Sequence, residues 1–252
     1  MGTIYAIANQ KGGVGKTTTA VNVAACVAEA GYATLLVDID AQANATVALG
    51  VDKSTEPSVY DVLRGDVEAA AAVVPTEIEG LSLLPANPDL AAATVELARE
   101  DGSETRLRDA LEPLRDRFRF LLLDCPPSLG PLTINALAAA DRVIVPVQTE
   151  YFALEGLAGL LDTLKLIQRR LNPRLAIAGM LLTMHDSRTR LSNDVEREVR
   201  QHFPDLVFDT VIPRNVRISE APSYGVPVIH HDPHSSGSSA YFDLAKEMVA
   251  RG

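Results

Sequence analysis

The sequence predicts an α/β fold in which a doubly wound, mostly parallel sheet carries helices on both faces. Short apolar runs of strand length alternate with helical patterns along the 252 residues. Most of these runs are apolar on both faces rather than alternating between apolar and polar residues, which is typical of parallel strands that are covered on both sides. With 47% apolar residues, the chain can also fill the core that such a sheet requires. We expect one domain spanning residues 1–252.

The expected elements follow one another as strand and helix in turn. The strands are 3–8, 33–38, 81–85, 120–124, 142–147, 175–183 and 208–213. The helical patterns lie near 17–30, 104–116, 131–139, 153–171 and 189–202. The final residues, AYFDLAKEMVARG, carry an apolar stripe at helical spacing and predict a helix docked on the core. The histidine-containing segment before it, 228–239, is expected to be a polar loop rather than a metal site.

The composition constrains the partners only weakly. The formal net charge of −10 argues against nucleic acid, but residues 165–217 carry ten Lys and Arg against six Asp and Glu. A locally basic region on an acidic body can hold a polyanion, although composition alone favours an ordinary solvated surface. The two cysteines form no disulfide framework, and we expect neither a signal peptide nor a membrane span. These features predict a soluble cytoplasmic protein.

The segment IANQKGGVGKTTTA, residues 7–20, follows an expected strand and opens an expected helix. Glycines at this point let backbone N–H groups turn toward an anion, and the helix N-terminus adds its positive dipole. Lys16 can reach the β- and γ-phosphates of a nucleotide, and the Thr17 hydroxyl can hold Mg²⁺. A dinucleotide fingerprint would need glycine at position 18, where the chain has Thr18. The expected nucleotide-binding residues of the loop are Gly12, Gly13, Val14, Gly15, Lys16, Thr17 and Thr18.

The loop departs from the common phosphate-loop pattern at its first position. A glycine is expected five residues before Gly15, where the chain has Gln10 followed by a second lysine, Lys11. Lys16 already serves the β- and γ-phosphate oxygens from inside the loop. Because Lys11 starts from the outer side, we expect it to act on a nucleotide across a dimer interface, as an arginine finger does in trans.

Three carboxylates stand at the ends of expected strands. Asp38 and Asp40 close LLVDID, and residues two apart on a strand face the same side, so a persisting strand would point both into the site. Asp124 ends FLLLD, the strand that precedes two prolines. Phosphoryl transfer requires one acid near Mg²⁺ and one group that orients the attacking water. We expect Thr17, Asp38 and Asp124 at the metal.

The motif KGGVGKTT resembles the deviant Walker A loop of the class that contains ParA, MinD and the nitrogenase iron protein. The resemblance implies a P-loop nucleoside-triphosphatase fold, ATP and Mg²⁺ as cofactors, and a nucleotide-sandwich dimer in which Lys11 reaches the phosphates held by the other subunit. It also implies that Asp40 is the hydrolytic aspartate, which makes Lys11, Lys16 and Asp40 the catalytic set. The segment DAQAN departs from the family's usual DPQGN at Ala41 and Ala43 but keeps the aspartate.

Nearly the whole chain resembles the Soj-type chromosome-partitioning ATPases, which are ParA proteins. The similar segments are ANQKGGVGKTTTAVN, DCPPSLGPLTINALAAAD, LLTMHDSRT and IPRNVRISEAPSYGVPV. Arg188 and Arg217 match the positions at which Soj-type proteins bind DNA without sequence preference. An arginine fork suits this role because it can bond two phosphate oxygens at once. Arg190 and Arg214 are weaker candidates for the same surface.

The triplet PRN at 213–215 resembles the adenine pocket of this family. An asparagine side chain can both donate and accept a hydrogen bond, which suits the edge of adenine. We assign Asn215 to the base and Pro213 to its flank. Met184 is a candidate for packing on the ring, and an ordinary core position is nearly as good an interpretation.

Two other branches of the class are alternatives. A MinD-like ATPase that positions a protein cargo or binds a membrane needs a basic amphipathic C-terminal helix. The last helix expected here mixes acidic with basic residues on its polar face, so we expect no stable membrane anchor. An iron–sulfur carrier or reductase needs several thiolates, and the chain offers only Cys26 and Cys125.

The resemblance therefore implies an ATP-dependent switch in DNA partitioning. ATP would join two subunits, the homodimer would hold double-stranded DNA non-specifically, and a ParB-type partner would stimulate an otherwise slow hydrolysis that releases the DNA. The protein would be cytoplasmic, and associated with the nucleoid when ATP is bound. Because the chain has no room for a helix-turn-helix before the phosphate loop, we expect no sequence-specific reading.

Overall fold

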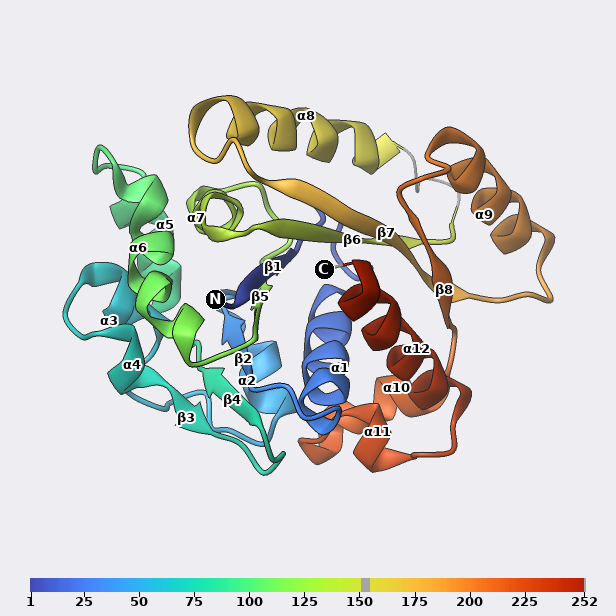
Figure 1. The fold of residues 1–252 in the computed structure, drawn as a ribbon, viewed down its shortest axis with the longest axis horizontal. Coiled ribbons are helices and arrows are strands. Elements are labelled where there is room, and N and C mark those ends of the chain that lie inside the picture. The colour runs from blue at the N-terminus through green and yellow to red at the C-terminus, as the bar shows by residue number, and fades with distance from the viewer. Residues whose placement is uncertain (151–154, 252) are drawn as a thin grey trace.

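One sheet carries the strands of the chain (Figure 1). The computed structural model describes residues 1–150 and 155–251. The strands are β1 (Thr3–Ile7), β2 (Thr34–Asp38), β3 (Val74–Pro75), β4 (Leu81–Leu84), β5 (Phe120–Asp124), β6 (Arg142–Gln148), β7 (Ala176–His185) and β8 (Val207–Pro213). They lie in the order β3-β4-β2-β5-β1-β6-β7-β8, and all neighbouring pairs are parallel except β3 with β4.

Helices cover both faces of this sheet, as Figure 1 shows. One face carries α1 (Lys16–Glu29), α2 (Asn44–Ala48), α10 (Val216–Glu220), α11 (Val228–His231) and α12 (Ser236–Arg251). The other face carries α3 (Val59–Arg64), α4 (Ala69–Ala72), α5 (Leu90–Leu97), α6 (Arg106–Leu111), α7 (Pro131–Ala139), α8 (Glu155–Arg170) and α9 (Arg190–His202). The predicted fold class, a doubly wound and mostly parallel sheet, is confirmed.

Strand β1 shows why the apolar runs do not alternate. Ile4 and Ala6 point into the core on one face of the sheet, and Tyr5 and Ile7 point into the core on the other. All four side chains are at most 1% exposed. Successive side chains of a strand leave opposite faces, so a strand that is buried on both faces must be apolar at every position.

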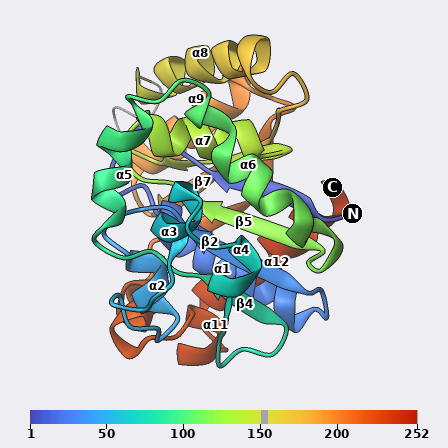
Figure 2. The same cartoon turned by 90° about the vertical axis from the view of Figure 1, so that its left-hand side faces the viewer.

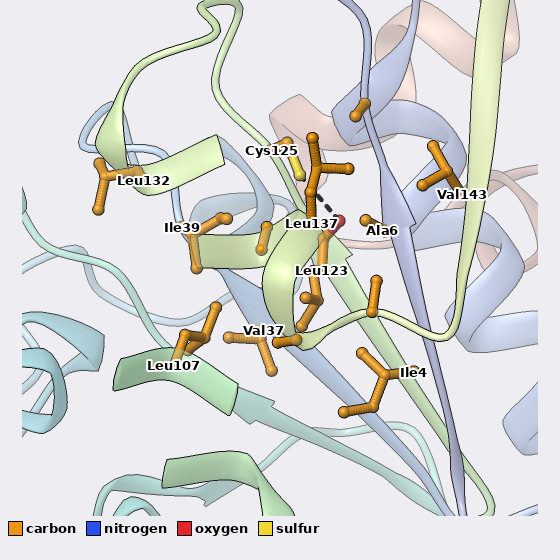
Figure 3. Packing of buried hydrophobic residues seen from close by; sticks show 14 of the residues in the cluster. Ile4, Ala6, Val37, Ile39, Leu107, Leu123, Cys125, Leu132, Leu137 and Val143 are labelled. Carbon is orange, nitrogen blue, oxygen red and sulfur yellow. Dashed lines mark hydrogen bonds between the residues drawn. The ribbon is translucent and has the colours of Figure 1, made fainter. Parts of the chain in front are cut away.

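The larger of the two cores lies between the central strands and the helices α6 and α7 (Figure 3). Ile4, Val37 and Leu123 enter it from the strands, and Leu107 and Leu137 enter it from the helices. Each of these side chains is at most 1% exposed, and full burial of one such side chain contributes roughly 1.5–3 kcal/mol. Figure 2 shows this half of the molecule from its edge, with α3, α5 and α6 nearest the viewer.

The seven predicted strands are confirmed, and each lies within two residues of its predicted ends. The helices predicted near 17–30, 131–139 and 189–202 are confirmed as α1, α7 and α9. Of the helix predicted over 153–171, residues 153–154 lie outside the described residues, and α8 covers the rest up to Arg170. The segment 104–116 is helical but broken, because Pro113 lacks an N–H and the chain continues as a 3₁₀ turn over Glu112–Asp116.

The short elements were missed. Helices α2 to α5, α10 and α11 have four to eight residues, too few turns to give a periodic signal, and β3 has two residues. The prediction of a polar loop over 228–239 was wrong, because α11 occupies its start and α12 begins at Ser236. The buried Ser238 hydroxyl explains this polar helix start, since it lies within hydrogen-bond distance of the carbonyls of Asp232 at 2.6 Å and of Val228 at 3.1 Å.

Parallel register brings the carboxyl ends of three central strands to one edge of the sheet. Asp38 at the end of β2 pairs with Asp124 at the end of β5, and Ile7 at the end of β1 pairs with Asp124 from the other side. The last residues of β7 and β8, His185 and Pro213, pair at the same edge. The glycine loop, the carboxylates and the arginine-bearing loops therefore all begin from this edge.

Packing between β7 and β8 leaves no room for a side chain at Gly179. A Cβ atom there would lie 2.5 Å from a ring carbon of the buried Phe208. We predict that Gly179→Ala lowers the free energy of unfolding by about 2 kcal/mol, since overpacking of this kind costs about 1–3 kcal/mol. For a chain of this size that is a fall in melting temperature of roughly 4–8 °C, measurable by circular dichroism.

Combining Gly179→Ala with Phe208→Leu tests whether the Phe208 ring causes the loss of stability. In a Phe208→Leu background the ring is gone, so the added methyl group should cost much less than it costs in the parent. An equal cost of Gly179→Ala in both backgrounds would contradict the steric explanation.

Candidate nucleotide-binding site

The loop between β1 and α1 has the backbone of an anion cradle. Gly13 and Gly15 adopt φ values of 73° and 85°, which residues with a side chain rarely adopt. A Cβ atom built at Gly13 would meet nothing within 4 Å among the described residues, and Gly12 and Gly13 are exposed. The loop therefore opens toward solvent, and the N-terminus of α1 directs its positive dipole at the opening.

Lys16 lies in the first turn of α1 and is 6% exposed. Its ammonium group donates a hydrogen bond to the Lys11 carbonyl oxygen at 3.0 Å, so it points back across the loop. Burial lowers the pKa of Lys16, and the negative charge of Asp124 opposes this by raising it. A buried cation beside a carboxylate and an anion cradle is placed to meet phosphate oxygens.

Lys11 has a fixed backbone and a half-exposed side chain. Its N–H donates to the Asn9 side-chain oxygen at 3.0 Å, and Asn9 in turn donates to the Pro146 carbonyl at 2.6 Å. No hydrogen bond or ion pair from the Lys11 ammonium is present within residues 1–150 and 155–251. The mouth of the loop thus holds a cation that the described part of its own subunit does not neutralise.

Asp124 is fully buried, yet neither of its carboxylate oxygens accepts a hydrogen bond of acceptable geometry from a described residue. Burial raises the pKa of Asp124 well above its usual range and the charge of Asp38 raises it further, whereas the nearby Thr17 hydroxyl lowers it. A buried carboxylate without partners is unfavourable. Magnesium prefers carboxylate and other oxygen ligands, so an orphaned carboxylate beside a threonine hydroxyl fits this ion.

Asp38 is also fully buried, but its oxygens have partners. It accepts hydrogen bonds from the Asp40 N–H at 3.1 Å, and from the Thr46 N–H and hydroxyl at 2.9 and 2.8 Å. Burial raises the pKa of Asp38 to about 6, and the hydrogen bonds from Thr46 and Asp40 limit the rise. Asp38 therefore anchors the loop after β2 while adding its negative charge to the neighbouring Asp124.

Asp40 does not share a strand face with Asp38, because β2 ends at Asp38. Its side chain is partly exposed, and its Oδ1 atom accepts the Gln42 N–H at 3.0 Å. The charge of Asp40 is nonetheless close enough to raise the pKa of Asp124. The two acids of LLVDID thus lie in one site but at different depths.

The turn after Asp40 keeps a left-handed residue where the family usually has glycine. Ala43 has φ 53°, and its N–H donates to the Asp40 carbonyl at 2.8 Å. A residue with a Cβ atom pays roughly 1–2 kcal/mol in this conformation. Ala43 is fully buried in the core, which offsets part of this cost. The turn therefore forms with alanine at position 43 in place of the family's usual glycine.

A cavity of about 210 Å³ adjoins the glycine loop. The residues predicted for the base, Met184, Pro213 and Asn215, line it together with Gly15 and Thr18 from the loop and helix α1. The structure therefore brings the separate sequence segments of the predicted nucleotide site to one cavity. Met184 itself has φ 52°, a strained value for a residue of this size.

Asn215 also has a structural role that the sequence did not reveal. Its side-chain oxygen accepts the Arg217 N–H at 2.8 Å and caps α10, and its amide group donates to the Ser236 hydroxyl at 2.9 Å. An amide can make up to four hydrogen bonds, so half of its capacity remains for a base.

The two predicted DNA-contacting arginines lie on neighbouring segments, Arg188 in the turn after β7 and Arg217 in the first turn of α10. The Arg214 N–H donates to the His185 carbonyl at 2.9 Å between these segments. The Arg188 side chain is 86% exposed and pairs with Asp186. The Arg217 side chain is 50% exposed and pairs with Glu220 and Asp232. Exposed pairs of this kind contribute little stability, so the guanidinium groups can exchange partners.

The cysteines and the last helix bear on the two alternatives, an iron–sulfur protein and a MinD-like membrane ATPase. Cys26 and Cys125 are buried in the cores on opposite faces of the sheet. Helix α12 buries its apolar stripe, including Tyr241 and Leu244, against the core that it shares with α1. No helix among the described residues is long and apolar enough to cross a bilayer.

Two residues of the site were missed by sequence reasoning. Thr46 fixes Asp38, and Thr183, which lines the cavity, donates to the Val14 carbonyl of the glycine loop at 2.9 Å. Thr183 belongs to the segment LLTMHDSRT, but nothing in a single sequence indicates which residue lies opposite it.

Comparisons with known proteins agree with this geometry. A family model described as an AAA domain matches residues 2–177. The sporulation initiation inhibitor protein Soj of Bacillus subtilis is 53% identical over 253 residues, which cover 100% of both chains. The chromosome-partitioning ATPase Soj of Thermus thermophilus is 55% identical over 246 residues, which cover 98% of this chain and 95% of the relative.

A solved structure is similar over the same extent. The protein named as cobyrinic acid a,c-diamide synthase from Mycobacterium smegmatis, with a bound ATP analogue and magnesium, superposes with a TM-score of 0.85 at 42% identity. The match covers 98% of this chain and 93% of that one. With its glycine loop, paired lysines and buried carboxylates in place, the chain belongs to the AAA-domain family and, within it, to the Soj/ParA family of chromosome-partitioning ATPases.

Proposed function

We propose that the protein is an ATP-dependent DNA-partitioning switch, whose ATP-bound homodimer holds DNA and releases it after hydrolysis. The observation that carries the proposal is the orphaned Asp124 carboxylate, buried beside Thr17 and Lys16 at the end of a glycine loop. In a magnesium–triphosphate complex, the metal supplies a positive charge for the Asp124 carboxylate and the phosphates supply negative charge for Lys16. The names of the Soj relatives support the cellular role.

ATP and Mg²⁺ fit the residues at the sheet edge. Thr17 and Asp124 would hold the metal, with Asp38 contributing charge from behind, and the loop N–H groups and Lys16 would hold the phosphates. When bound, Mg²⁺ neutralises charge on the β- and γ-phosphates. The Mycobacterium smegmatis protein with its ATP analogue and magnesium supports this assignment.

Asp40 is the residue we assign to the attacking water. It is partly exposed at the mouth of the site, and within the described residues its Oδ2 atom accepts no hydrogen bond. A carboxylate oxygen in this position can accept a proton or a hydrogen bond from water. Lys16 would stabilise the charge that develops on the transferred phosphoryl group. The half-exposed position of Asp40 suits an enzyme that is slow until a partner orders the site.

Lys11 is the residue we assign to the second subunit. Its ammonium group lies at the loop mouth on a backbone held by Asn9, and the described residues of its own subunit offer it no anion. A cation placed in this way can cross a dimer interface to the partner's triphosphate. ATP would then favour the dimer, because only the triphosphate offers the charge that Lys11 contacts.

Arg188 and Arg217 would form the DNA surface. They stand at the ends of adjacent strands, at the same edge of the sheet as the nucleotide site. One subunit supplies few cations on an acidic body with a net charge of −10, so a second subunit is needed for useful affinity. Contacts to phosphate carry no base information, and binding should be indifferent to sequence and sensitive to salt.

The proposal also includes a partner protein and a cellular location. A ParB-type protein would stimulate hydrolysis, and the ATP-bound dimer would remain in the cytoplasm on the nucleoid. A MinD-like positioning role on a membrane is less well supported, because α12 buries its apolar stripe in its own core. An iron–sulfur role is less well supported because Cys26 and Cys125 are buried in separate cores.

The role of Lys11 can be tested separately from ATP binding. Lys11→Ala should leave ATP affinity nearly unchanged and should abolish the dimer that forms with Mg²⁺ and a non-hydrolysable ATP analogue. Sedimentation velocity measures the dimer and calorimetry measures the affinity. Lys53→Ala, at an exposed lysine in the turn that follows α2, is the matched control and should dimerise like the parent. Unchanged dimerisation of Lys11→Ala would refute the cross-subunit role.

DNA binding tests the switch itself. The parent should bind DNA with ATP present, and weakly with ADP or without nucleotide. Arg188→Glu combined with Arg217→Glu should reduce DNA affinity about 100-fold or more and leave ATP affinity intact, since the reversed charges repel phosphates. Fluorescence anisotropy of DNA at several salt concentrations measures the nucleotide dependence of DNA binding and the loss of DNA affinity in the double variant.

A charge-matched variant controls for net charge. Arg64→Glu with Arg99→Glu makes the same change in net charge near α3 and α5, on the opposite side of the molecule in Figure 1, and should retain most of the DNA affinity. Equal losses in both double variants would mean that the DNA surface is misplaced. DNA binding by the parent that ignores nucleotide would overturn the switch.

A further inference from the structure

Strand β7 holds the glycine loop through one side chain. The Thr183 hydroxyl donates to the Val14 carbonyl at 2.9 Å, across 169 residues of sequence. Thr183 is 2% exposed and Val14 is 1% exposed, so water does not compete for this bond. Within residues 1–150 and 155–251, no other hydrogen bond to the Val14 carbonyl is present. Without Thr183 this buried carbonyl would have no partner.

The bond fixes the orientation of one peptide unit in the loop. The Val14 carbonyl and the Gly15 N–H belong to the same planar trans peptide, so they point in opposite directions. Among the described residues nothing accepts a hydrogen bond from the Gly15 N–H. Gly15 has φ 85° and no Cβ, so its peptide could rotate at little steric cost if the carbonyl were released. Holding the carbonyl at Thr183 keeps the N–H directed away from β7.

Thr183 is itself held in place. Its carbonyl accepts the Thr149 N–H at 3.2 Å and the Thr149 hydroxyl at 3.4 Å. The Thr149 carbonyl in turn accepts the hydroxyl of Ser192, at the start of α9, at 3.3 Å. The γ-methyl group of Thr183 also faces Gly15, where an added Cβ atom would lie 4.0 Å away. The backbone and the γ-methyl group of Thr183 are therefore both held, and its hydroxyl approaches the loop from a fixed position.

We propose that Thr183 is a positioning residue for the nucleotide, whose hydroxyl holds the Val14 carbonyl so that the Gly15 N–H faces the phosphates. Thr183 acts through the loop backbone and needs no contact with the phosphates. Loss of the hydroxyl leaves the carbonyl free to turn inward, where its oxygen would repel the anion. The inference rests on the proposed function, because it requires that the loop binds a nucleotide.

The test uses Mg²⁺–ADP and Mg²⁺ with a non-hydrolysable ATP analogue, because their binding to one subunit requires neither DNA nor a dimer. Thr183→Val keeps the shape of the side chain and removes the hydroxyl. Calorimetry should show a roughly tenfold loss of affinity for both nucleotides, the size expected when one buried hydrogen-bond partner is removed. Thr183→Ser keeps the donor and should restore most of the parent affinity.

A second threonine separates this role from simple loss of stability. Thr34 is fully buried, and its hydroxyl donates to the Tyr32 carbonyl at 2.8 Å at the opposite, amino-terminal end of its strand. Thr34→Val should lower the melting temperature, as Thr183→Val should, but should bind nucleotide like the parent.

Two outcomes would overturn the inference. One is parent-like affinity in Thr183→Val, and the other is an equal loss in Thr183→Ser, which would place the effect in packing rather than in the hydroxyl. Failure of the parent to bind either nucleotide would contradict the proposed function itself, so the two failures are distinguishable.

Discussion

The site depends on two buried carboxyl groups placed side by side. Asp38 and Asp124 end neighbouring strands in register, and both are fully buried. Asp38 is partly compensated by hydrogen bonds from Thr46 and Asp40, whereas Asp124 has no hydrogen-bond partner among the described residues. Burial of such a pair is unfavourable unless cations share it. Lys16 supplies one positive charge, and a divalent cation bound with a nucleotide supplies the rest.

The parallel sheet places the site of these two carboxylates and the proposed DNA-contacting arginines at one edge. The glycine loop leaves β1 in the middle of the sheet. The turn with Arg188 follows β7 and helix α10 with Arg217 follows β8, all at the carboxyl edge. Thr183 joins the two regions, since it lies on β7 and holds the glycine loop. The glycine loop and the strand that leads to Arg188 are therefore joined by a direct hydrogen bond between buried groups.

The sequence predicted the sheet well, because a strand buried on both faces must be apolar on both, as β1 is over Ile4–Ile7 and β5 over Phe120–Leu123. It also predicted the glycine loop and the ending of β5 at Asp124, which are local patterns. It did not predict that Thr46 would hold Asp38, that Asn215 would cap α10, or that Thr183 would meet Val14. Such pairings arise only when distant segments pack. The short helices between Asn44 and Leu97 were missed for a related reason, since tertiary packing stabilises them more than their own periodicity does.

The central claim is that the orphaned Asp124 carboxylate is a magnesium ligand. The most direct measurement is the calorimetric affinity for ATP with Mg²⁺ and with EDTA, in the parent and in Asp124→Asn. Mg²⁺ should strengthen ATP binding by the parent at least about tenfold, and in the amide variant this gain should disappear. In EDTA the variant should bind ATP at least as tightly as the parent, because a charge that repels phosphate is gone. Equal affinities of the parent with Mg²⁺ and with EDTA would contradict the account.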